Sequence, residues 1–369
     1  MKSVFEKHLI TSLYKSSSGL RIQILLKECL MNEDYILITG ANGEVGHGLI
    51  NHLAKVGHKK IIAFSRSPLS EELRPMVSNP MAMDVQDREG LAELFENFNI
   101  TTVYHLASIL STKGEHDPVL AHNINVNGTM NLLDLCVKQM EKTGRPVKFI
   151  YPSSIAVHAI PNLTVKSEAG KVKEYDYVQS TTMYGINKLY CENLGRYFNN
   201  YYKQLNYAPN ERPYVDFRAL RFPGLISADT MPTGGTSDYG PEMIHAAASN
   251  KHYNCFVRPD STLPFMVMPD AIKSLVMLHA ADRERLTQTV YNVTSFSPTA
   301  QEICDVTKAA FPNATIDFVP DVNRQGIVDS WPADIDDSAA RKDWDWEPDY
   351  NFDRAINEYL IPAIRQRYA

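Results

Sequence analysis

The residues with the clearest chemical potential are a tyrosine and a lysine four positions apart, Tyr184 and Lys188. Apolar residues at Met183, Ile186 and Leu189 predict a helix here, on which positions four apart share one face. A phenol with a pKa near about 10 is a poor base at neutral pH, but an adjacent ammonium favours the phenolate and lowers that pKa. The pair therefore predicts a general acid–base, and the alternative is a tyrosine and a lysine on a solvated helix.

Two other short segments supply companions for this pair. Pro152-Ser153-Ser154 closes a predicted strand, where the Ser154 hydroxyl is placed to hold a substrate oxygen. An asparagine-rich segment, residues 123–129 with Asn125 in it, is expected to open the helix that follows the preceding strand.

A glycine-rich segment, Gly40-Ala41-Asn42-Gly43-Glu44-Val45-Gly46, follows a short apolar strand and precedes a helical pattern. This context is typical of a dinucleotide site, because glycines allow a tight turn and the free N–H groups of the helix face a pyrophosphate. The alternative is a helix start with incidental glycines. The loop residues expected to contact the cofactor are Gly40, Asn42, Gly43, Glu44, Val45 and Gly46.

The adenosine end of the cofactor is expected to meet the second and third strands. The second strand ends in Ser65-Arg66, where an acidic residue would bind ribose hydroxyls. A hydroxyl and a guanidinium at this point favour the 2′-phosphate of NADP, unless Arg66 only stacks on adenine or faces solvent. Further cofactor contacts are expected after the third and fourth strands, from Asp84, Val85, Leu106, Ala107 and Ser108.

Short apolar strands and amphipathic helices alternate along the chain. Strands are predicted at 35–39, 61–64, 81–83, 102–107, 147–151 and 217–221, and helices near 49–56, 91–98, 131–140, 183–194, 270–279 and 300–311. This alternation predicts an α/β fold, a Rossmann-type doubly wound parallel sheet with ligands at the carboxyl ends of its strands. The pattern loosens after residue 222, which predicts a smaller, interleaved C-terminal substrate-binding lobe.

The expected organisation has three parts. Residues 1–34 are an N-terminal extension, 35–222 are mainly the nucleotide-binding domain, and 223–369 are mainly the lobe, with 250–295 returning to the nucleotide-binding domain. The first 30 residues hold five Lys or Arg against two acids. They are either a mitochondrial transit peptide or an extension upstream of a second start at Met31; the second is favoured, with a cytoplasmic location.

The composition argues against several classes of function. The chain has 369 residues, a net charge of −6 and a pI of about 6.0, with no basic stripe, so no nucleic-acid partner is expected. The five cysteines form no CxxC pair, which argues against a metal site or a disulfide framework. No apolar run approaches the roughly 20 residues that span a bilayer, so no membrane partner is expected.

In this order, the glycine loop, the serine segment and the tyrosine–lysine pair resemble the extended short-chain dehydrogenase/reductase superfamily, over residues 35 to about 365. The resemblance implies that Tyr184 is the base, Lys188 its activator, Ser154 a hydroxyl donor and Asn125 a supporting residue. Tyr184 and Lys188 would also contact the cofactor, as would Pro223 in the turn beside the nicotinamide.

The same resemblance implies a cofactor and an assembly. NAD is the expected cofactor, and NADP stays open because of Ser65-Arg66. A homodimer through two helices per subunit is expected by analogy alone. The expected ligand is a small-molecule substrate.

Several stretches resemble one branch of the superfamily, the short-chain type L-threonine 3-dehydrogenases. They are residues 105–111 with 114–115, 152–157, 221–227, 235–239, 263–271, 291–294 and 330–332. The resemblance implies oxidation of the β-hydroxyl of L-threonine, an amino acid, to 2-amino-3-oxobutyrate. The implied substrate contacts are Ser111, Ser154, Tyr184, Gly224, Thr236, Ser237, Asp238 and Trp331.

Two of these contacts have a second interpretation. Asp238 faces either the substrate ammonium or its own loop, and Trp331 either closes the pocket or only packs the lobe. The chain also departs from the branch pattern. It has Ser65-Arg66 where the second strand ends in Asp, His158-Ala159 where Phe-Gly is usual, and Thr236-Ser237 in place of two threonines.

Two other functions compete with this one. A nucleotide-sugar epimerase or dehydratase on the same scaffold would need a larger, more basic pocket for a diphosphate, and residues 231–252 offer few cations, chiefly Lys251. A non-enzymatic protein that senses redox state through a bound dinucleotide is disfavoured by the intact Ser154, Tyr184 and Lys188.

Overall fold

The computed structural model describes residues 34–232 and 234–368, and the structural findings below concern that part of the chain. The predictions for the N-terminal extension therefore lie outside the described residues, except for Asp34, which begins the first strand.

Seven strands form one sheet, in the order β11-β7-β5-β4-β1-β2-β3. Every neighbouring pair is parallel. This confirms the predicted Rossmann-type α/β fold. The strands are β1 (Asp34–Thr39), β2 (Ile61–Ser65), β3 (Asn79–Ala82), β4 (Asn99–His105), β5 (Lys148–Ser154), β7 (Asp216–Phe222) and β11 (Val290–Asn292).

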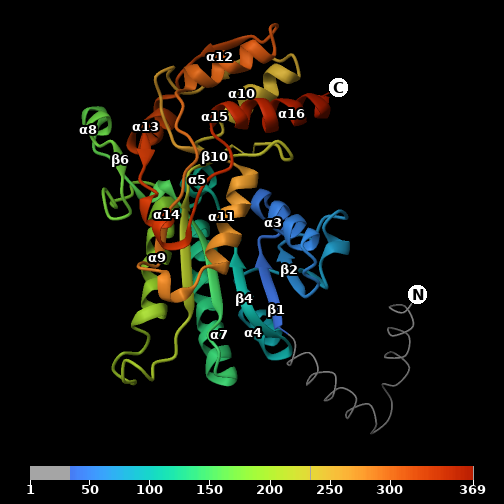
Figure 1. The fold of residues 1–369 in the computed structure, drawn as a ribbon, viewed down its shortest axis with the longest axis vertical. Coiled ribbons are helices and arrows are strands. Elements are labelled where there is room, and N and C mark those ends of the chain that lie inside the picture. Colours follow the sequence, from blue (N-terminus) through green and yellow to red (C-terminus); the bar gives the residue numbers. More distant parts are fainter. Residues whose placement is uncertain (1–33, 233, 369) are drawn as a thin grey trace.

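Helices cover both faces of the sheet (Figure 1). One apolar layer holds α3 (Glu44–Lys55), α11 (Met268–Ala280) and α14 (Ser338–Trp344) against the sheet. The opposite layer holds α4 (Arg88–Asn97), α7 (Gly128–Thr143) and α9 (Met183–Asn200). Because both faces are covered, most of the strands carry a short run of buried apolar residues, which is why such runs predict them; the edge strand β3 is partly exposed.

Three sequence expectations about these elements need correction. The seventh strand, β11, was not predicted, because three residues with only two apolar side chains carry too little signal. Strand β4 ends at His105 rather than at residue 107. Asn125 does not open a helix: it lies in a π-helical turn, η2 (Asn123–Asn127), between α6 (Pro118–His122) and α7.

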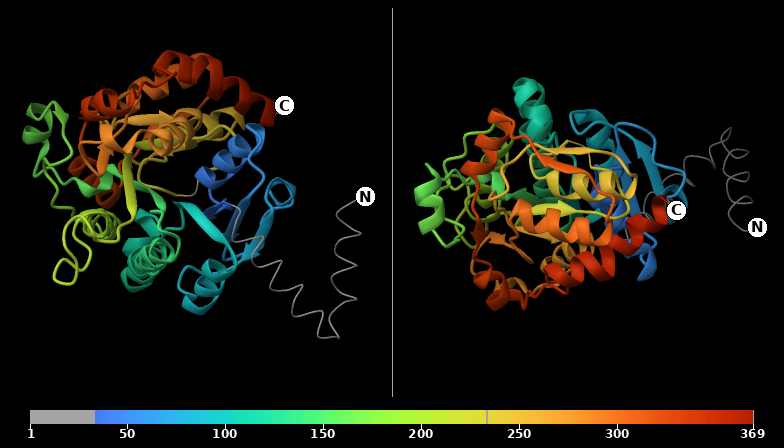
Figure 2. Two further views of the ribbon diagram at one scale, coloured as in Figure 1. Left: turned by 60° about the horizontal axis from the view of Figure 1, so that its bottom comes forward. Right: turned by 90° about the horizontal axis from the view of Figure 1, so that it is seen from above.

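A second apolar core defines the lobe, which lies at the top of the view in Figure 1 and is seen from above in Figure 2, right. Three two-stranded parallel pairs, β10–β8, β12–β9 and β13–β6, belong to it or border it. Its strands are β6 (Lys171–Val172), β8 (Gly224–Ile226), β9 (Tyr253–Cys255), β10 (Phe265–Val267), β12 (Ile316–Phe318) and β13 (Asp334–Ile335). Its helices are α8 (Leu163–Glu168), α10 (Tyr239–Ala248), α12 (Ala300–Ala310), α13 (Val322–Ser330), α15 (Phe352–Arg354), η5 (Ala355–Leu360) and α16 (Ile361–Tyr368).

The remaining short elements connect these units. They are the short helix α5 (Ser111–His116) and the 3-10 turns η1 (Arg74–Met76), η3 (Ile155–Val157) and η4 (Arg283–Arg285). The stretch of 250–295 that lies on the large sheet is the part from α11 to β11, since β9 and β10 pair within the lobe. Among the described residues, no helix combines the length and apolarity that crossing a membrane requires.

Candidate active site

The glycine loop joins β1 to α3 in a conformation that requires glycine at two positions. Gly40 has φ of 68°, and a Cβ there would collide with the backbone of Ala107. A Cβ on Gly46 would collide with the backbone of Ala41, so this glycine lets helix and loop pack closely. The N-cap residue of α3 is Gly43, which has no side chain that could cap the helix. Its first N–H groups are therefore free to bind an anion, and the loop fits the pyrophosphate of a dinucleotide.

Two neighbouring cavities open beside this loop and share Gly40, Gly43, Leu106 and Ser108 as wall residues. The adenosine-side cavity has a volume of about 590 Å³, and the catalytic cavity about 310 Å³. The predicted residues on the first are Gly40, Asn42, Gly43, Ser65, Arg66, Asp84, Val85, Leu106, Ala107 and Ser108. Those on the second are Gly40, Gly43, Glu44, Val45, Gly46, Leu106, Ser108, Ser111, Ser154, Tyr184, Lys188, Pro223, Gly224, Thr236, Ser237, Asp238 and Trp331.

The adenosine-side cavity is shaped by contacts between the glycine loop and the end of β2. Ser65 Oγ accepts a hydrogen bond from the Asn42 N–H at 3.0 Å, and the Asn42 amide donates to Ser67 Oγ at 3.1 Å. Arg66 is exposed on the cavity rim. Asp84 uses one oxygen to accept from the Gln86 N–H at 2.9 Å, within its own turn. The cavity thus offers one exposed guanidinium and hydroxyls at the end of β2.

Helix α9 places Tyr184 and Lys188 on the wall of the catalytic cavity, opposite the end of β5. The Thr182 side chain caps the helix by accepting from the Gly185 N–H at 3.2 Å, which fixes Tyr184 in the first turn. Lys188 is buried, and its Nζ donates to the Pro152 carbonyl at 2.7 Å and lies 5.6 Å from the Tyr184 ring centroid. Ser154, the last residue of β5, interacts with the Tyr184 hydroxyl.

The pKa of Tyr184 corrects one expectation. The sequence predicts that Lys188 lowers it, but burial raises the pKa of the phenol to about 12, and the Ser154 hydroxyl lowers it only in part. Burial also lowers the pKa of Lys188, to about 8. Both shifts have one cause: an enclosed site disfavours the charged form of each group. The protein alone therefore holds Tyr184 as a neutral phenol at neutral pH.

Asn125 lies beside neither cavity but holds a segment that borders both. Its Oδ1 accepts from the Ile109 N–H at 2.7 Å and from Ser108 Oγ at 3.1 Å, and its Nδ2 donates to the Ile109 carbonyl at 3.0 Å. The predicted supporting residue thus acts on the chain that leaves β4. This placement is that of a positioning residue rather than of a group in contact with ligand.

The hydroxyl-rich loop before α10 forms the wall of the catalytic cavity on the lobe side. Thr236 Oγ1 and Ser111 Oγ are 3.1 Å apart and both residues are buried, so the pair joins the lobe to α5. Asp238 Oδ2 accepts from the N–H groups of Gly234 and Gly235 at 2.8 and 2.6 Å. Of its two interpretations, the loop role is thus realised in the structure, although the residue also borders the cavity.

Two further residues complete the lobe side. Trp331 is buried in the lobe core and also borders the catalytic cavity. Its position is therefore compatible with both interpretations, packing of the lobe and closure of the pocket. A Cβ on Gly224 would meet the Phe265 ring and crowd Ser237, which shows how tightly the loop lies on β8.

Glu44, at the first position of α3, is the other carboxylate on this wall. Burial, and next the charge of Asp238, raise its pKa to about 7, while the Thr230 hydroxyl lowers it. A carboxyl group that titrates near neutral pH therefore stands in the loop expected to bind a pyrophosphate.

Sequence reasoning predicted some apolar wall residues, such as Val85, Leu106 and Trp331, but missed others in both cavities. The missed wall residues are Phe64, Met83, Ile109 and Ile124 on the adenosine side, and Leu110, Ile155, Phe222 and Leu225 on the catalytic side. Most of them are next to a predicted site residue at the end of a strand. The position of the strand ends is therefore the sequence signal that could have identified them. Among the described residues, no group of three or more His, Cys, Asp or Glu is arranged to hold a metal ion.

Fold and site together define a dinucleotide-dependent protein of the short-chain dehydrogenase/reductase type. Residues 36–294 match the NAD dependent epimerase/dehydratase family. The chain belongs to this family, and is an NAD(P)-dependent oxidoreductase or epimerase-type enzyme.

Within this family, the chain is similar to L-threonine 3-dehydrogenases. The mitochondrial L-threonine 3-dehydrogenase of Bos taurus is 31% identical over 335 residues, which are 89% of this chain and 82% of that protein. The structure of L-threonine dehydrogenase from Clostridium difficile is 32% identical, covers 91% of this chain and 98% of that one, and superimposes with a TM-score of 0.78. A UDP-glucose 4-epimerase from Thermotoga maritima has a TM-score of 0.75 at 17% identity, over 91% of this chain and all of that one, and shows the fold alone.

Proposed function

We propose that this protein oxidises the β-hydroxyl of L-threonine to 2-amino-3-oxobutyrate with a nicotinamide dinucleotide. The observation that carries the proposal is the composition of the catalytic cavity. Its volume is about 310 Å³, and it brings Tyr184 and Ser154 together with the hydroxyls of Ser111, Thr236 and Ser237. A small pocket that places several hydroxyls among apolar walls suits an amino acid better than a larger substrate.

The residues divide the reaction between them. A bound oxidised nicotinamide would supply the hydride acceptor for Cβ of the substrate, and its positive ring charge would favour the phenolate of Tyr184. Tyr184 accepts the hydroxyl proton, so that the alcohol becomes a ketone with the loss of one hydride and one proton. Ser154 holds the reacting oxygen, and Lys188 supports the phenolate with its ammonium charge.

The substrate's charged groups need separate partners. Ser111, Thr236 and Ser237 provide hydroxyls for the carboxylate, and the free oxygen of Asp238 and the carboxyl of Glu44 lie on the same wall for the ammonium. Trp331 closes the lobe side and excludes water. These assignments are part of the proposal and rest on shared walls of the cavity.

The cofactor proposal is NAD, with NADP as the alternative. NAD fits the family. Arg66, exposed on the rim next to Ser65 and Ser67, favours the alternative, because a guanidinium with hydroxyls binds a 2′-phosphate well. Parallel measurement of the Kd of both dinucleotides decides between them.

A nucleotide-sugar epimerase is the second candidate, because it shares the family and the fold. The cavity counts against it. Lys188 is the single Lys or Arg among the described residues on its wall, and that lysine is directed at the Pro152 carbonyl. A diphosphate group would lack the guanidinium partners that usually bind it.

The direct experiment is to incubate the purified protein with L-threonine and either NAD+ or NADP+ while following the absorbance of the reduced cofactor. Reduction is expected with at least one of them. The absence of reduction with both would overturn the proposal. UDP-glucose, assayed for epimerisation in parallel, tests the second candidate.

The location and assembly remain proposals. We propose a cytoplasmic protein, or a mitochondrial one like the bovine relative if residues 1–30 act as a transit peptide. We also propose that it forms a homodimer.

A further inference from the structure

Helix α9 carries a third residue in register with the two predicted catalytic ones. Glu192 follows Tyr184 and Lys188 at the same four-residue spacing, so the three side chains lie along one face of the helix. Glu192 is only 3% exposed. A carboxylate buried to this extent needs strong partners, and none of the roles assigned so far uses it.

The partners of Glu192 come from the two strands that end at the catalytic cavity. Arg221, in β7, donates to it in bidentate fashion, from Nε to Oε1 at 2.8 Å and from Nη2 to Oε2 at 2.7 Å. Ser153, in β5, donates from Oγ to Oε1 at 2.5 Å. One carboxylate therefore ties α9 to both strands.

The tie to β5 acts directly beside Ser154. Lys188 holds the Pro152 carbonyl, and one turn later Glu192 holds the Ser153 hydroxyl. Helix α9 thus fixes two consecutive residues before Ser154, while the same helix carries Tyr184. These two hydrogen bonds, to the Pro152 carbonyl and from the Ser153 hydroxyl, therefore set the position of the Ser154 hydroxyl relative to the Tyr184 phenol.

Arg221 extends the network beyond the helix. Its Nη1 donates to the Glu174 carbonyl at 2.6 Å and lies 3.3 Å from His158 Nε2. His158 Nδ1 in turn lies 2.8 Å from the Asp176 carbonyl oxygen. The departure from the branch pattern at residue 158 therefore supplies a polar neighbour to Arg221. The residue after Arg221 is Phe222, which with Pro223 borders the cavity.

We infer that Glu192 is a positioning residue for the Tyr184–Lys188–Ser154 centre: together with Arg221 it fixes the end of β5 against α9, and its negative charge keeps Lys188 protonated. The inference rests on the proposed dehydrogenase function for its kinetic test.

The surroundings of Lys188 support the electrostatic half of this inference. Burial lowers the pKa of Lys188, and the neighbouring Cys191 and Glu192 raise it. Burial also raises the pKa of the Cys191 thiol and keeps it neutral at neutral pH, so Glu192 supplies the negative charge beside the lysine. The other titratable groups that face the lysine are His105 from β4, Tyr151 from β5 and Tyr184. His105 is held neutral by burial, which lowers its pKa to about 3, so it supplies no competing charge.

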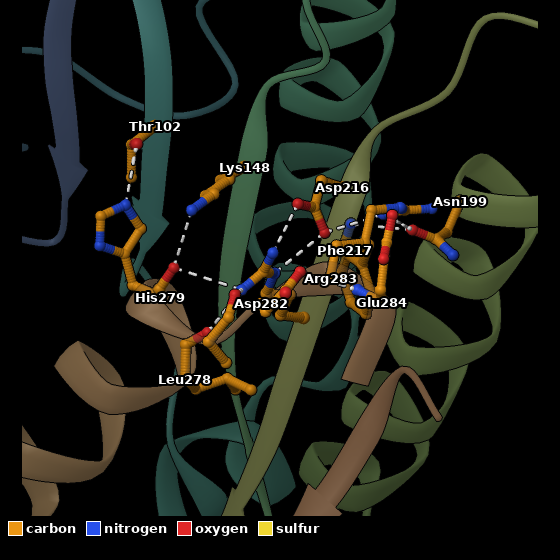
Figure 3. A network of polar contacts seen from close by, with 12 residues as sticks. Thr102, Lys148, Asn199, Asp216, Phe217, Leu278, His279, Asp282, Arg283 and Glu284 are labelled. Atoms are coloured by element: carbon orange, nitrogen blue, oxygen red, sulfur yellow. Dashed lines mark hydrogen bonds and ion pairs between the residues drawn. The ribbon is translucent and has the colours of Figure 1, made fainter. Parts of the chain in front are cut away.

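The competing explanation is that the Glu192–Arg221 pair only stabilises the fold. A matched pair in the same strand separates the two. At the start of β7, the buried Asp216 pairs with Arg218, from Nη2 to Oδ2 at 2.8 Å, and with Arg283, from Nη1 to Oδ1 at 2.9 Å (Figure 3). Arg218 also donates to the carbonyls of Leu278, at 2.8 Å, and Ala281, so this network anchors the end of α11.

The two networks are chemically alike but differently placed. Each has a buried carboxylate and an arginine from β7. Residues three apart in a strand point to opposite faces of the sheet, so Arg218 faces α11 and Arg221 faces α9. Asp216→Asn therefore removes the same charge as Glu192→Gln, at the other end of the strand.

The experiment compares wild type, Glu192→Gln and Asp216→Asn in full-length protein. Selective 13C labelling of lysine at Cε, with the Lys188 signal assigned by its loss in Lys188→Arg, gives the pKa of Lys188 by NMR titration. Glu192→Gln is expected to lower this pKa by roughly one unit, because a neighbouring opposite charge is lost. Asp216→Asn is expected to leave it unchanged although it also lowers the Tm.

Kinetics provide the second readout. In Glu192→Gln, kcat for L-threonine oxidation is expected to fall roughly tenfold or more with KM little changed, because a group that acts in proton transfer is displaced. Equal behaviour of Glu192→Gln and Asp216→Asn in both readouts would reduce Glu192 to a stabilising residue and overturn the inference.

Glu192→Gln leaves Arg221 buried without a counter-ion, so a milder variant covers the case in which it does not fold. Ser153→Ala removes one hydrogen bond and keeps every charge. It is expected to lower kcat without changing the Lys188 pKa, and a wild-type kcat would overturn the positioning role. If wild type does not oxidise L-threonine at all, the proposed function fails, while the NMR comparison still decides the effect of Glu192 on Lys188.

Discussion

At the scale of residues, the site is governed by the cost of enclosing charge. Tyr184 and Lys188 are adjacent on α9, yet burial pushes their pKa values in the directions that neutralise both, to about 12 and about 8. A positive cofactor ring and the Glu192 carboxylate each oppose one of these shifts. In the proposed reaction, the tyrosine–lysine pair therefore acts as an acid–base only when the cofactor is bound and Glu192 is ionised.

Tyr184→Phe tests the role of the phenol. It is expected to reduce turnover by roughly 100-fold or more, because proton transfer loses its acceptor, while the Kd for NAD+ measured by calorimetry stays nearly unchanged. Tyr239→Phe is the matched control: Tyr239 is buried in the lobe, and its hydroxyl has no hydrogen-bond partner in the part of the chain that the structure describes. Retained turnover in Tyr184→Phe would remove Tyr184 from the mechanism.

Glu44 predicts a pH dependence of cofactor binding. With a pKa of about 7, the carboxyl is neutral below that pH and anionic above it, where it repels a pyrophosphate held at the same helix start. The Kd for NAD+ is therefore expected to rise by roughly three- to tenfold between about pH 6 and about pH 8. Glu44→Gln keeps the shape without the charge, so its Kd should vary much less. The same pH dependence in both proteins would mean that Glu44 does not sense the cofactor.

At the scale of elements, strand ends and one loop carry the chemistry. The loop of residues 234–238 is held by Asp238 from within, by the Thr236–Ser111 hydroxyl pair, and by Thr112 Oγ1, which donates to the Gly234 carbonyl at 2.6 Å. Arg324 of α13 fixes its other side by donating to the Gly235 carbonyl at 2.9 Å. These contacts make the loop a defined wall of the cavity rather than a loose surface segment.

Thr236→Ala combined with Ser237→Ala tests the loop as a substrate contact. KM for L-threonine is expected to rise roughly tenfold or more, because two hydroxyl partners of the substrate are lost. Thr164→Ala with Ser167→Ala, two exposed positions on α8, is the control with equal loss of hydroxyls. If KM is the same in both double variants, the loop has no role in binding threonine.

The sequence predicts these elements to different degrees. Short apolar runs locate six strands of the large sheet, because a parallel sheet that is covered on both faces buries such runs. Apolar residues at helical spacing locate its main helices. The seventh strand of the sheet, β11, is too short to carry the strand signal. Asn125 is predicted as a site residue, but its real partner, the backbone of Ile109, is set by tertiary packing. The pKa of Tyr184 is beyond sequence reasoning for the same reason, since spacing gives the neighbouring charge and not the burial.

At the scale of the whole molecule, the catalytic cavity lies where the sheet unit and the lobe meet, because its wall residues come from both, whereas the adenosine-side cavity is lined by the sheet unit alone. The sheet unit supplies the glycine loop and the Tyr184 centre, and the lobe supplies the hydroxyl loop and Trp331. The catalytic cavity exists only where both units contribute, so the placement of the lobe sets the size of the substrate.

The proposed homodimer is a prediction at this scale. Helix α9 exposes Ile186, Tyr190 and Tyr197, and Tyr201 just after it is exposed as well. None of them borders the catalytic cavity, and together they are an unusual amount of exposed apolar surface. Light scattering is expected to give twice the chain mass of 41.6 kDa, and Ile186→Asp with Tyr190→Asp is expected to give the single mass. A wild-type mass of 41.6 kDa would contradict the prediction.

The most direct test of the central claim follows the hydride itself. L-threonine that carries deuterium at Cβ is incubated with the enzyme and the preferred oxidised cofactor, and the reduced cofactor is analysed by mass spectrometry. The proposed reaction predicts one deuterium on the reduced nicotinamide and none when the label is at Cα. Reduced cofactor without deuterium, or no reduction at all, would contradict oxidation at the β-carbon.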